Sequence, residues 1–166
     1  MIAMSRKCWN SASNEYMVTF QGCIDEPHAF DYFGQRVRAS DGSLIGSNFV
    51  ITSTLDDEGP GGVAYDSDMN RYLVVYAGWG DSPWGQFVSA SGTLLGNRFA
   101  IGSGSLSGVM CNVAWNPVTK EYLATWAHCC SSGNFGRRIS QTGAMIGETF
   151  RTNGGVQGYG NWDPLP

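Results

Sequence analysis

The chain contains the stretch Tyr65-Asp66…Arg71-Tyr72-Leu73-Val74-Val75…Trp84-Gly85-Gln86-Phe87…Gly92-Thr93-Leu94-Leu95-Gly96…Phe99. Two other stretches follow the same pattern: Trp9-Asn10…Glu15-Tyr16-Met17-Val18…Phe33-Gly34-Gln35-Arg36…Gly42-Ser43-Leu44-Ile45-Gly46…Phe49 and Trp115-Asn116…Glu121-Tyr122-Leu123-Ala124…Phe135-Gly136-Arg137-Arg138…Gly143-Ala144-Met145-Ile146-Gly147…Phe150. A pattern that returns at such a period indicates an array of one supersecondary unit. The repeat therefore decides the fold before any single residue does.

The three copies share one framework and differ in one interval. The glycines Gly34, Gly85 and Gly136 recur every 51 residues. The interval between the tyrosine of each copy and this glycine, in contrast, is 18, 13 and 14 residues in chain order. Loops that vary on a constant framework are the usual position of recognition sites. We therefore expect any functional site in these loops.

Each copy contains four short segments rich in β-branched and aromatic residues, which fit half-buried strands. We predict first strands that end on Trp9, Tyr65 and Trp115. The predicted second strands are 15–20, 71–77 and 121–127, the third are 34–39, 85–90 and 136–140, and the fourth are 48–52, 98–102 and 148–152. We assign six repeated aromatic residues to the core: Trp9, Tyr65, Trp115, Tyr16, Tyr72 and Tyr122.

The connections within each copy carry turn residues. Asn10, Asp66 and Asn116 open the connection between the first two strands, where a short polar side chain can bond the backbone two residues further on. A glycine follows each third strand, where a tight hairpin needs a positive φ. The run 66–70 is similar to the start of a calcium loop but lacks its glycine and its late glutamate, so we predict a plain turn.

The composition is that of a folded domain. Of the 166 residues, 42% are hydrophobic and 14% are charged, which argues against disorder. A net charge of −4 without a basic patch argues against a nucleic-acid partner. No apolar run approaches the roughly 20 residues of a membrane helix, so we expect no membrane partner. The first seven residues lack the apolar stretch of a signal peptide, so we expect a cytoplasmic protein, or a secreted one if a leader precedes this sequence.

The five cysteines do not suit a disulfide framework, because their number is odd. We interpret them as free thiols in a reducing compartment. Cys23, Cys129 and Cys130 have histidines near them in sequence, and thiolate with imidazole suits zinc. No Cys-x-x-Cys pair is present, however, so we predict no metal site and no cofactor.

The second copy reads Val63-Ala64-Tyr65-Asp66, then Asn70-Arg71-Tyr72-Leu73-Val74-Val75-Tyr76 and Trp84-Gly85-Gln86, and the third begins Val113-Ala114-Trp115-Asn116-Pro117. This pattern resembles the blade repeat of bacterial β-propeller-like proteins, which typically runs VAYNP…NEYLVVW…YGQRV…DG…LG. The resemblance implies an all-β, β-propeller-like domain over residues 1–166, with three four-stranded antiparallel blades at about 6–54, 61–104 and 111–153. Its motifs are structural, so they imply a fold and no activity. For the tail, 154–166, we weigh an extra strand against a frayed end, because 160–164 echoes the start of a copy.

Three blades are too few for a closed propeller, which typically has 4–8. Three blades alone would leave two apolar blade faces uncovered. We therefore expect a homodimer whose two chains complete a six-bladed ring. The alternative is a monomeric β-trefoil, which needs only three units.

The variable loops hold most of the residues that could bind a ligand. Exposed aromatic rings beside carboxylates suit a carbohydrate or a small polar ligand, because the ring stacks on an apolar face while carboxylates accept hydroxyl bonds. The alternative for the tryptophans is packing at a blade edge. The candidate ligand-binding residues are Asp25, Glu26, His28, Trp79, Asp81, Trp84 and His128.

The sequence contains no catalytic motif. A nucleophile elbow, a zinc-protease helix and a phosphate loop are all missing. We therefore expect a binding or scaffold module, lectin-like if its ligand is a carbohydrate, rather than an enzyme. One alternative is a glycosidase-like hydrolase that uses loop carboxylates such as Asp25 and Asp81. Another alternative is a purely structural or interaction protein.

Overall fold

The computed structural model of the chain describes residues 5–23, 30–53, 58–78, 82–102, 108–128 and 133–152. These residues form twelve β-strands and their turns, so the all-β prediction is confirmed. No helix long and apolar enough to cross a membrane occurs in this part of the chain. The strands are β1 (Ser5–Asn10), β2 (Glu15–Gly22), β3 (Asp31–Arg38), β4 (Leu44–Thr52), β5 (Glu58–Asp66), β6 (Arg71–Gly78), β7 (Pro83–Ser89), β8 (Leu94–Ala100), β9 (Gly108–Asn116), β10 (Glu121–His128), β11 (Asn134–Ser140) and β12 (Met145–Arg151).

The strands form three four-stranded antiparallel sheets, one for each copy of the repeat, as predicted. We call them the first sheet (β1–β4), the second sheet (β5–β8) and the third sheet (β9–β12). In each sheet the strands follow one another in chain order. The β-trefoil alternative is wrong, because a trefoil pairs strands of different repeats in one barrel. The strands described here pair only within their own repeat.

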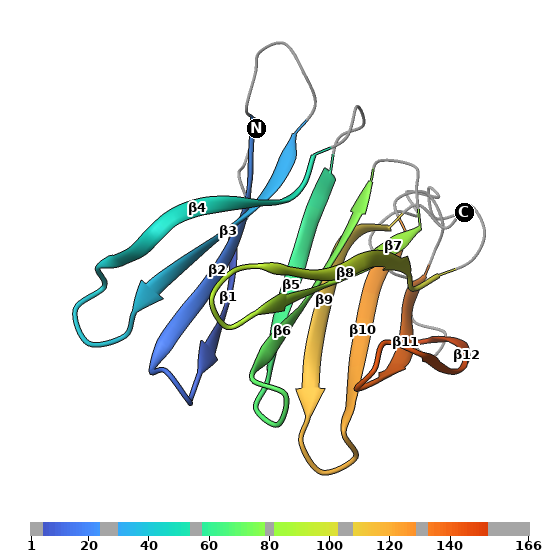
Figure 1. Cartoon of the computed structure of the whole chain (residues 1–166). Coiled ribbons are helices and arrows are strands. Elements are labelled where there is room, and N and C mark those ends of the chain that lie inside the picture. The colour runs from blue at the N-terminus through green and yellow to red at the C-terminus, as the bar shows by residue number, and fades with distance from the viewer. Residues whose placement is uncertain are drawn as a thin grey trace, which may run out of the picture.

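The second sheet lies between the other two (Figure 1). Its first strand, β5, packs against β1 and β2 on one side and against β9 on the other. The sheets are therefore layers of one open array. Among the described strands, no fourth sheet covers the outward face of the first sheet or of the third.

A glycine lies directly opposite a phenylalanine in the third and fourth strands of every sheet. The three pairs are Gly34 with Phe49, Gly85 with Phe99, and Gly136 with Phe150. In each pair the phenylalanine ring occupies the space that a side chain on the glycine would take. This close approach explains why both residues recur at fixed places in the sequence.

The fourth strands begin earlier than predicted, because the pairing continues past a second glycine. Gly96 in β8 has a φ of 66°, and the register of β7 and β8 shifts between Gly85 and Phe87. The buried side chain of Gln86 stabilises this irregularity. Its Nε2 donates to the carbonyl oxygens of Leu95 at 3.2 Å and Gly96 at 3.3 Å. Residues 94–97 are therefore strand and not hairpin.

The turns after the first strands are built as predicted. Oδ1 of Asn10 accepts hydrogen bonds from the amides of Ala12 at 2.9 Å and Ser13 at 3.1 Å. Asp66 accepts the two equivalent amides at 3.0 and 3.1 Å, which makes this segment a plain turn. Asn116 does the same at 2.9 and 3.3 Å.

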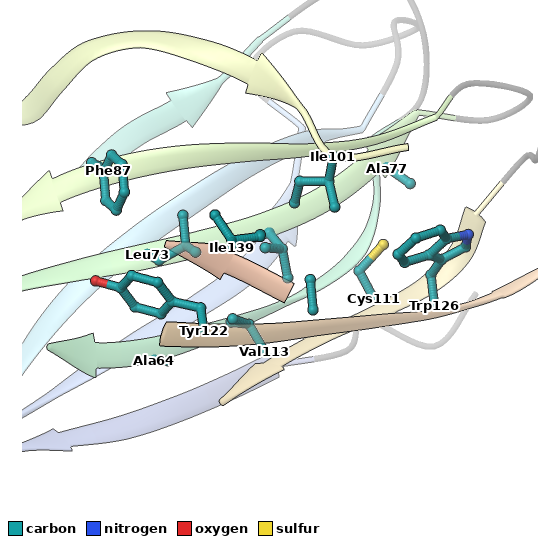
Figure 2. Packing of buried hydrophobic residues seen from close by; sticks show 12 residues of the cluster. Ala64, Leu73, Ala77, Phe87, Ile101, Cys111, Val113, Tyr122, Trp126 and Ile139 are labelled. Atoms are coloured by element: carbon teal, nitrogen blue, oxygen red, sulfur yellow. The ribbon is translucent and has the colours of Figure 1, made fainter. Parts of the chain in front are cut away.

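Two buried clusters hold the three sheets together. Each sheet has two faces. We call the face on the third sheet's side of the array the front face, and the face on the first sheet's side the back face. The first junction packs the front of the first sheet on the back of the second, with Met17, Tyr32, Ile51, Val63, Tyr65, Tyr72, Val74, Tyr76 and Val88. The second junction packs the front of the second sheet on the back of the third (Figure 2), with Ala64, Leu73, Val75, Ala77, Phe87, Ile101, Cys111, Val113, Tyr122, Ala124, Trp126 and Ile139.

The core assignment of two repeated aromatic residues is wrong for the single chain. Tyr72 and Tyr122 are buried, as predicted. Tyr16, at the equivalent position of the first sheet, is 40% exposed, and its neighbour Trp9 is 53% exposed. The reason is that both lie on the back face of the first sheet, where none of the described strands packs against them.

Candidate functional site

Most of the predicted ligand-binding residues follow the second strands in the sequence, and the described ends of these strands lie beside the starts of the third strands. The antiparallel pairing brings the end of β2 beside the start of β3, and the same holds for β6 with β7 and for β10 with β11. Five of the predicted residues lie outside the described part of the chain: Asp25, Glu26, His28, Trp79 and Asp81.

Two predicted site residues belong to described strands. His128 is the last residue of β10, and its side chain lies outside what the structure describes. Trp84, in β7, packs against the first junction. The guanidinium carbon of Arg98 lies 4.3 Å from the centroid of the Trp84 ring. This environment favours packing as the role of Trp84, over stacking on a ligand.

The described residues offer no metal site, and two of their three thiols are deactivated by burial. No group of three His, Cys, Asp or Glu side chains among them could hold a metal ion. Cys8, Cys23 and Cys111 are free thiols in this structure. Burial raises the pKa of Cys8 and of Cys111 to about 12, so both stay protonated and unreactive at neutral pH. Cys129 and Cys130, and the tail from 153 onward, lie outside the described residues.

The back face of the first sheet is an aromatic surface. Trp9 and Tyr16 are paired across β1 and β2, and Phe20 stacks on Phe33 with ring centroids 5.7 Å apart. In the second sheet the residues equivalent to Tyr16 and Phe20 are Tyr72 and Tyr76, which are both buried in the first junction. The first sheet thus exposes the set of side chains that the second sheet buries.

The front face of the third sheet contains two depressions. The larger depression has a volume of about 360 Å³ and is lined by Asn116, Thr119, Glu121, Tyr122, Leu123, Arg138 and Phe150. The smaller depression has a volume of about 250 Å³ and is lined by Met110, Thr125, Trp126, Ala127, Asn134 and Thr152. Leu123 and Phe150 are 40% and 42% exposed. Both depressions lie on the face that would pack against a following sheet.

A tyrosine hydroxyl joins the sheets at each junction. In the first junction, Nδ2 of Asn10 donates to the hydroxyl of Tyr72 at 2.9 Å, and both groups are buried. In the second, the hydroxyl of Tyr122 donates to Oδ2 of Asp66 at 3.0 Å. In each junction the hydrogen-bond partner of the tyrosine hydroxyl is the turn residue of the preceding sheet, Asn10 or Asp66. We call this interaction the tyrosine contact.

The electrostatics keep both tyrosines neutral. Burial raises the pKa of Tyr72 to about 12. Burial and the neighbouring Asp66 carboxylate raise the pKa of Tyr122 well above its usual value. Asp66 is itself buried and also accepts from Nε2 of Gln141 at 3.2 Å. We therefore assign both tyrosine hydroxyls a structural role, because each is neutral and hydrogen-bonded inside a junction.

A hairpin glycine accompanies each tyrosine contact. Gly92, between β7 and β8, lies against the ring of Phe49 in the preceding sheet. Gly143, between β11 and β12, lies against Phe87 and Phe99 in the same way. The first junction adds a bond from Nη1 of Arg36 to the carbonyl oxygen of Ser91, at 3.4 Å. The tyrosine contact and the contact of the hairpin glycine with phenylalanine thus occur in both junctions.

Two uncovered end faces are expected from the sequence, but the residues that form them are not. Those residues come from three or four consecutive strands, so no single local motif marks them. The available signal was the repeat itself, because aligning Tyr16 with Tyr72 predicts that both need a covering sheet. A comparison with protein-family models and with curated proteins found no match.

Proposed function

We propose that the protein is a binding or scaffold module of propeller-type blades, in which two chains complete a six-bladed ring. The observation that carries this proposal is the face-to-face stacking of three consecutive four-stranded sheets, in which no other described strand covers either end of the stack. A propeller is built by such stacking around an axis. Two chains supply six blades, within the usual range for a closed ring.

The candidate ligand face is the edge at which the second strands end and the third strands begin. The sequence between these strands differs in length from copy to copy, while the pairing of the strands is the same in each sheet. A rigid framework that carries variable loops is typical of binding proteins. Carboxylates and aromatic rings in these segments favour a carbohydrate or a small polar ligand.

The binding role is tested by titrating isotopically labelled protein with simple mono- and disaccharides and recording amide chemical shifts. We expect shifts that saturate, and we expect Asp25→Asn and Asp81→Asn to weaken them. Asp41→Asn is the matched control, because Asp41 lies in the β3–β4 hairpin at the opposite edge and is exposed. Saturating shifts that both loop variants leave unchanged would refute the loop site.

A hydrolysis assay on nitrophenyl glycosides accompanies the titration. We expect binding without turnover. Turnover that Asp25→Asn or Asp81→Asn abolishes would replace the binding module with the glycosidase-like alternative. No shift with any saccharide would leave a scaffold role and remove the carbohydrate ligand.

A further inference from the structure

We infer that the front face of the third sheet binds the back face of the first sheet in a second copy of this chain, with Tyr16 of that copy against Asn116. This inference rests on the proposed ring and gives its closing contact residue by residue. The closing junction would be a third use of the contacts that already join the sheets within one chain.

The third sheet presents the same receiving residues as the first sheet. In the first sheet, Tyr72 packs on a front face with Asn10, the ion pair of Glu15 with Arg36, Met17 and Phe49. The equivalent residues of the third sheet line the larger depression. They are Asn116, the ion pair of Glu121 with Arg138, Leu123 and Phe150. Four of these five positions are identical, and the fifth replaces methionine with leucine.

The asparagines are prepared for the same bond. Oδ1 of Asn10 accepts two turn amides, and its Nδ2 donates to Tyr72. Oδ1 of Asn116 accepts the two equivalent amides. Its Nδ2 has no acceptor among the described residues, and the side chain is exposed. A tyrosine hydroxyl placed as Tyr72 is would complete the third tyrosine contact.

The first sheet presents the matching inserted residues. Tyr16 occupies the position of Tyr72 and Tyr122 in the repeat, and it is the exposed one of the three. Phe20 occupies the position of Tyr76, which packs beside Tyr32 in the first junction with ring centroids 6.1 Å apart. The spacing of Tyr16 and Phe20 along β2 therefore matches the two depressions, Tyr16 for the larger and Phe20 for the smaller.

The hairpin glycine is also in place. Gly92 and Gly143 lie against phenylalanines of the preceding sheet, whereas the Cβ position of Gly42 in the first sheet has nothing near it. The partner that the repeat assigns to Gly42 is Phe150, which is exposed at the other end of the chain. The two halves of one junction thus occur at opposite ends of the same molecule, which is why the occupant is a second copy.

The contact is heterologous, because a back face meets a front face. Two chains related by a two-fold axis form it twice and close the ring. Truncating one hot-spot aromatic residue weakens an interface about 30-fold. Because a two-chain ring has two closing junctions, one substitution should raise the dimer dissociation constant about a thousandfold.

The test is sedimentation equilibrium with native mass spectrometry on wild type, Tyr16→Asp and Leu123→Asp. We expect wild type at twice the 17.9 kDa mass of one chain, and each variant as a folded monomer by circular dichroism, because both side chains are exposed. Met69→Asp is the matched control, since Met69 is an exposed apolar side chain in a turn of the second sheet, and it should stay dimeric.

Mixing the two variants gives the decisive result. A heterodimer of Tyr16→Asp with Leu123→Asp has one intact junction and one junction in which both faces are altered. Because Tyr16 and Leu123 would meet in the same contact, the second substitution should cost little once the first has broken that contact. Mixing should therefore restore dimers that neither variant forms alone. A symmetric contact between two first sheets would be lost in Tyr16→Asp, unaffected in Leu123→Asp and not rescued by mixing. That pattern would overturn the inference.

The remaining outcomes separate the inference from the ring. Wild type that is monomeric at tens of micromolar overturns both. Wild type that is dimeric while Tyr16→Asp and Leu123→Asp also stay dimeric overturns this contact and leaves the two-chain ring. If Tyr16→Asp or Leu123→Asp lacks the circular dichroism signal of folded β-sheet, the milder Tyr16→Ser or Leu123→Ser takes its place. The same expectations apply to these variants.

Discussion

The ring of Phe99 lies over Gly85, its partner across β7 and β8, so closely that a Cβ on Gly85 would be 2.6 Å from Cζ of the ring. The same pair occurs in the other two sheets, with 2.4 Å at Gly34 and 2.9 Å at Gly136. An aromatic ring that covers a strand glycine replaces the missing side chain and fixes the register of the outer strands. The pair links the sequence repeat to the shape of the sheets.

Gly85→Ala should therefore destabilise the protein by overpacking. We expect a loss of about 1–3 kcal/mol in the free energy of unfolding, measured by urea denaturation. The Phe99 ring is the group that must move, so the cost should shrink when Gly85→Ala is combined with Phe99→Leu. Strictly additive effects of the two substitutions would show that the ring does not limit this position.

Gly96→Ala is the matched control for that experiment. Gly96 has open space at its Cβ position but a φ of +66°. Its substitution should cost about 1–2 kcal/mol through backbone strain. Since no ring is involved, Phe99→Leu should leave this cost unchanged.

The buried carboxylate of Asp66 gives a second prediction. It accepts hydrogen bonds from two turn amides, from the hydroxyl of Tyr122 and from the side-chain amide of Gln141. Its Oδ2 also lies 3.9 Å from Nε of Arg71. Asp66→Ala removes all of these partners and should cost about 3–5 kcal/mol. Asp66→Asn keeps an acceptor for the turn and should cost clearly less.

The pKa of Tyr122 gives an independent readout of the Asp66→Asn substitution. Asp66 is the second cause, after burial, of the raised pKa of Tyr122. Asp66→Asn should lower the pKa of Tyr122, as followed by ultraviolet titration. An unchanged titration would show that the carboxylate does not act on this hydroxyl. Asp41→Ala, in an exposed hairpin, should change the unfolding midpoint little.

The local parts of the fold were predictable from sequence, and the long-range parts were not. Asn10 and Asn116 were assigned to turns because their hydrogen bonds lie within three residues. Tyr16 was assigned to the core because its pattern is identical to that of Tyr72, but burial depends on what lies across the face. The fourth strands were predicted too short because Gln86 stabilises an irregular segment through side-chain bonds that no strand propensity contains.

The candidate sites differ in the same way. The loop residues were chosen for their type, and most of them lie outside the described residues. Trp84 shows the limit of that choice, since a tryptophan next to a loop can equally pack under Arg98. The larger depression combines residues of β9, β10, β11 and β12, so it becomes visible only when the sheets are assembled.

Gln86 provides a third prediction. Its Nε2 donates to three carbonyl oxygens, those of Phe87, Leu95 and Gly96. Gln86→Glu would place a carboxylate beside these oxygens and should cost about 2–4 kcal/mol at pH 7. This environment would raise the pKa of the new carboxyl in the folded state. The part of the cost that comes from the charge should therefore disappear as pH falls below the ordinary glutamate pKa of about 4.3.

Gln86→Met separates the charge from the lost hydrogen bonds. It has a similar shape, cannot donate and does not titrate, so its cost should be equal at pH 7 and pH 4. The comparison is made by urea denaturation at both pH values. A Gln86→Glu variant that is no more stable, relative to wild type, at pH 4 than at pH 7 would contradict the proposed environment.

The buried thiols give a fourth prediction, for alkaline pH. Burial raises the pKa of Cys8 and of Cys111 from 9.0 to about 12 in the folded state. Above pH 9 the unfolded chain loses these protons while the folded chain keeps them, so the folded state binds more protons and stability falls as pH rises. The loss runs from pH 9 to pH 12. Each thiol contributes about 1.4 kcal/mol per pH unit within that window.

Cys111→Ala isolates one thiol. The variant should be less stable at pH 8 because of its small cavity, but between pH 9 and pH 10 its stability should fall clearly less steeply than that of wild type, since only Cys8 and the buried tyrosines remain to contribute. The measurement is urea denaturation in reducing buffer below pH 10, and the contribution of the buried tyrosines cancels in the difference because it is the same in both proteins. Cys23→Ala is the control for the loss of a thiol as such, because Cys23 is exposed and lies outside the buried clusters of both junctions. Equal slopes for wild type and Cys111→Ala would mean that water reaches Cys111, and that the second junction opens more readily than its packing indicates.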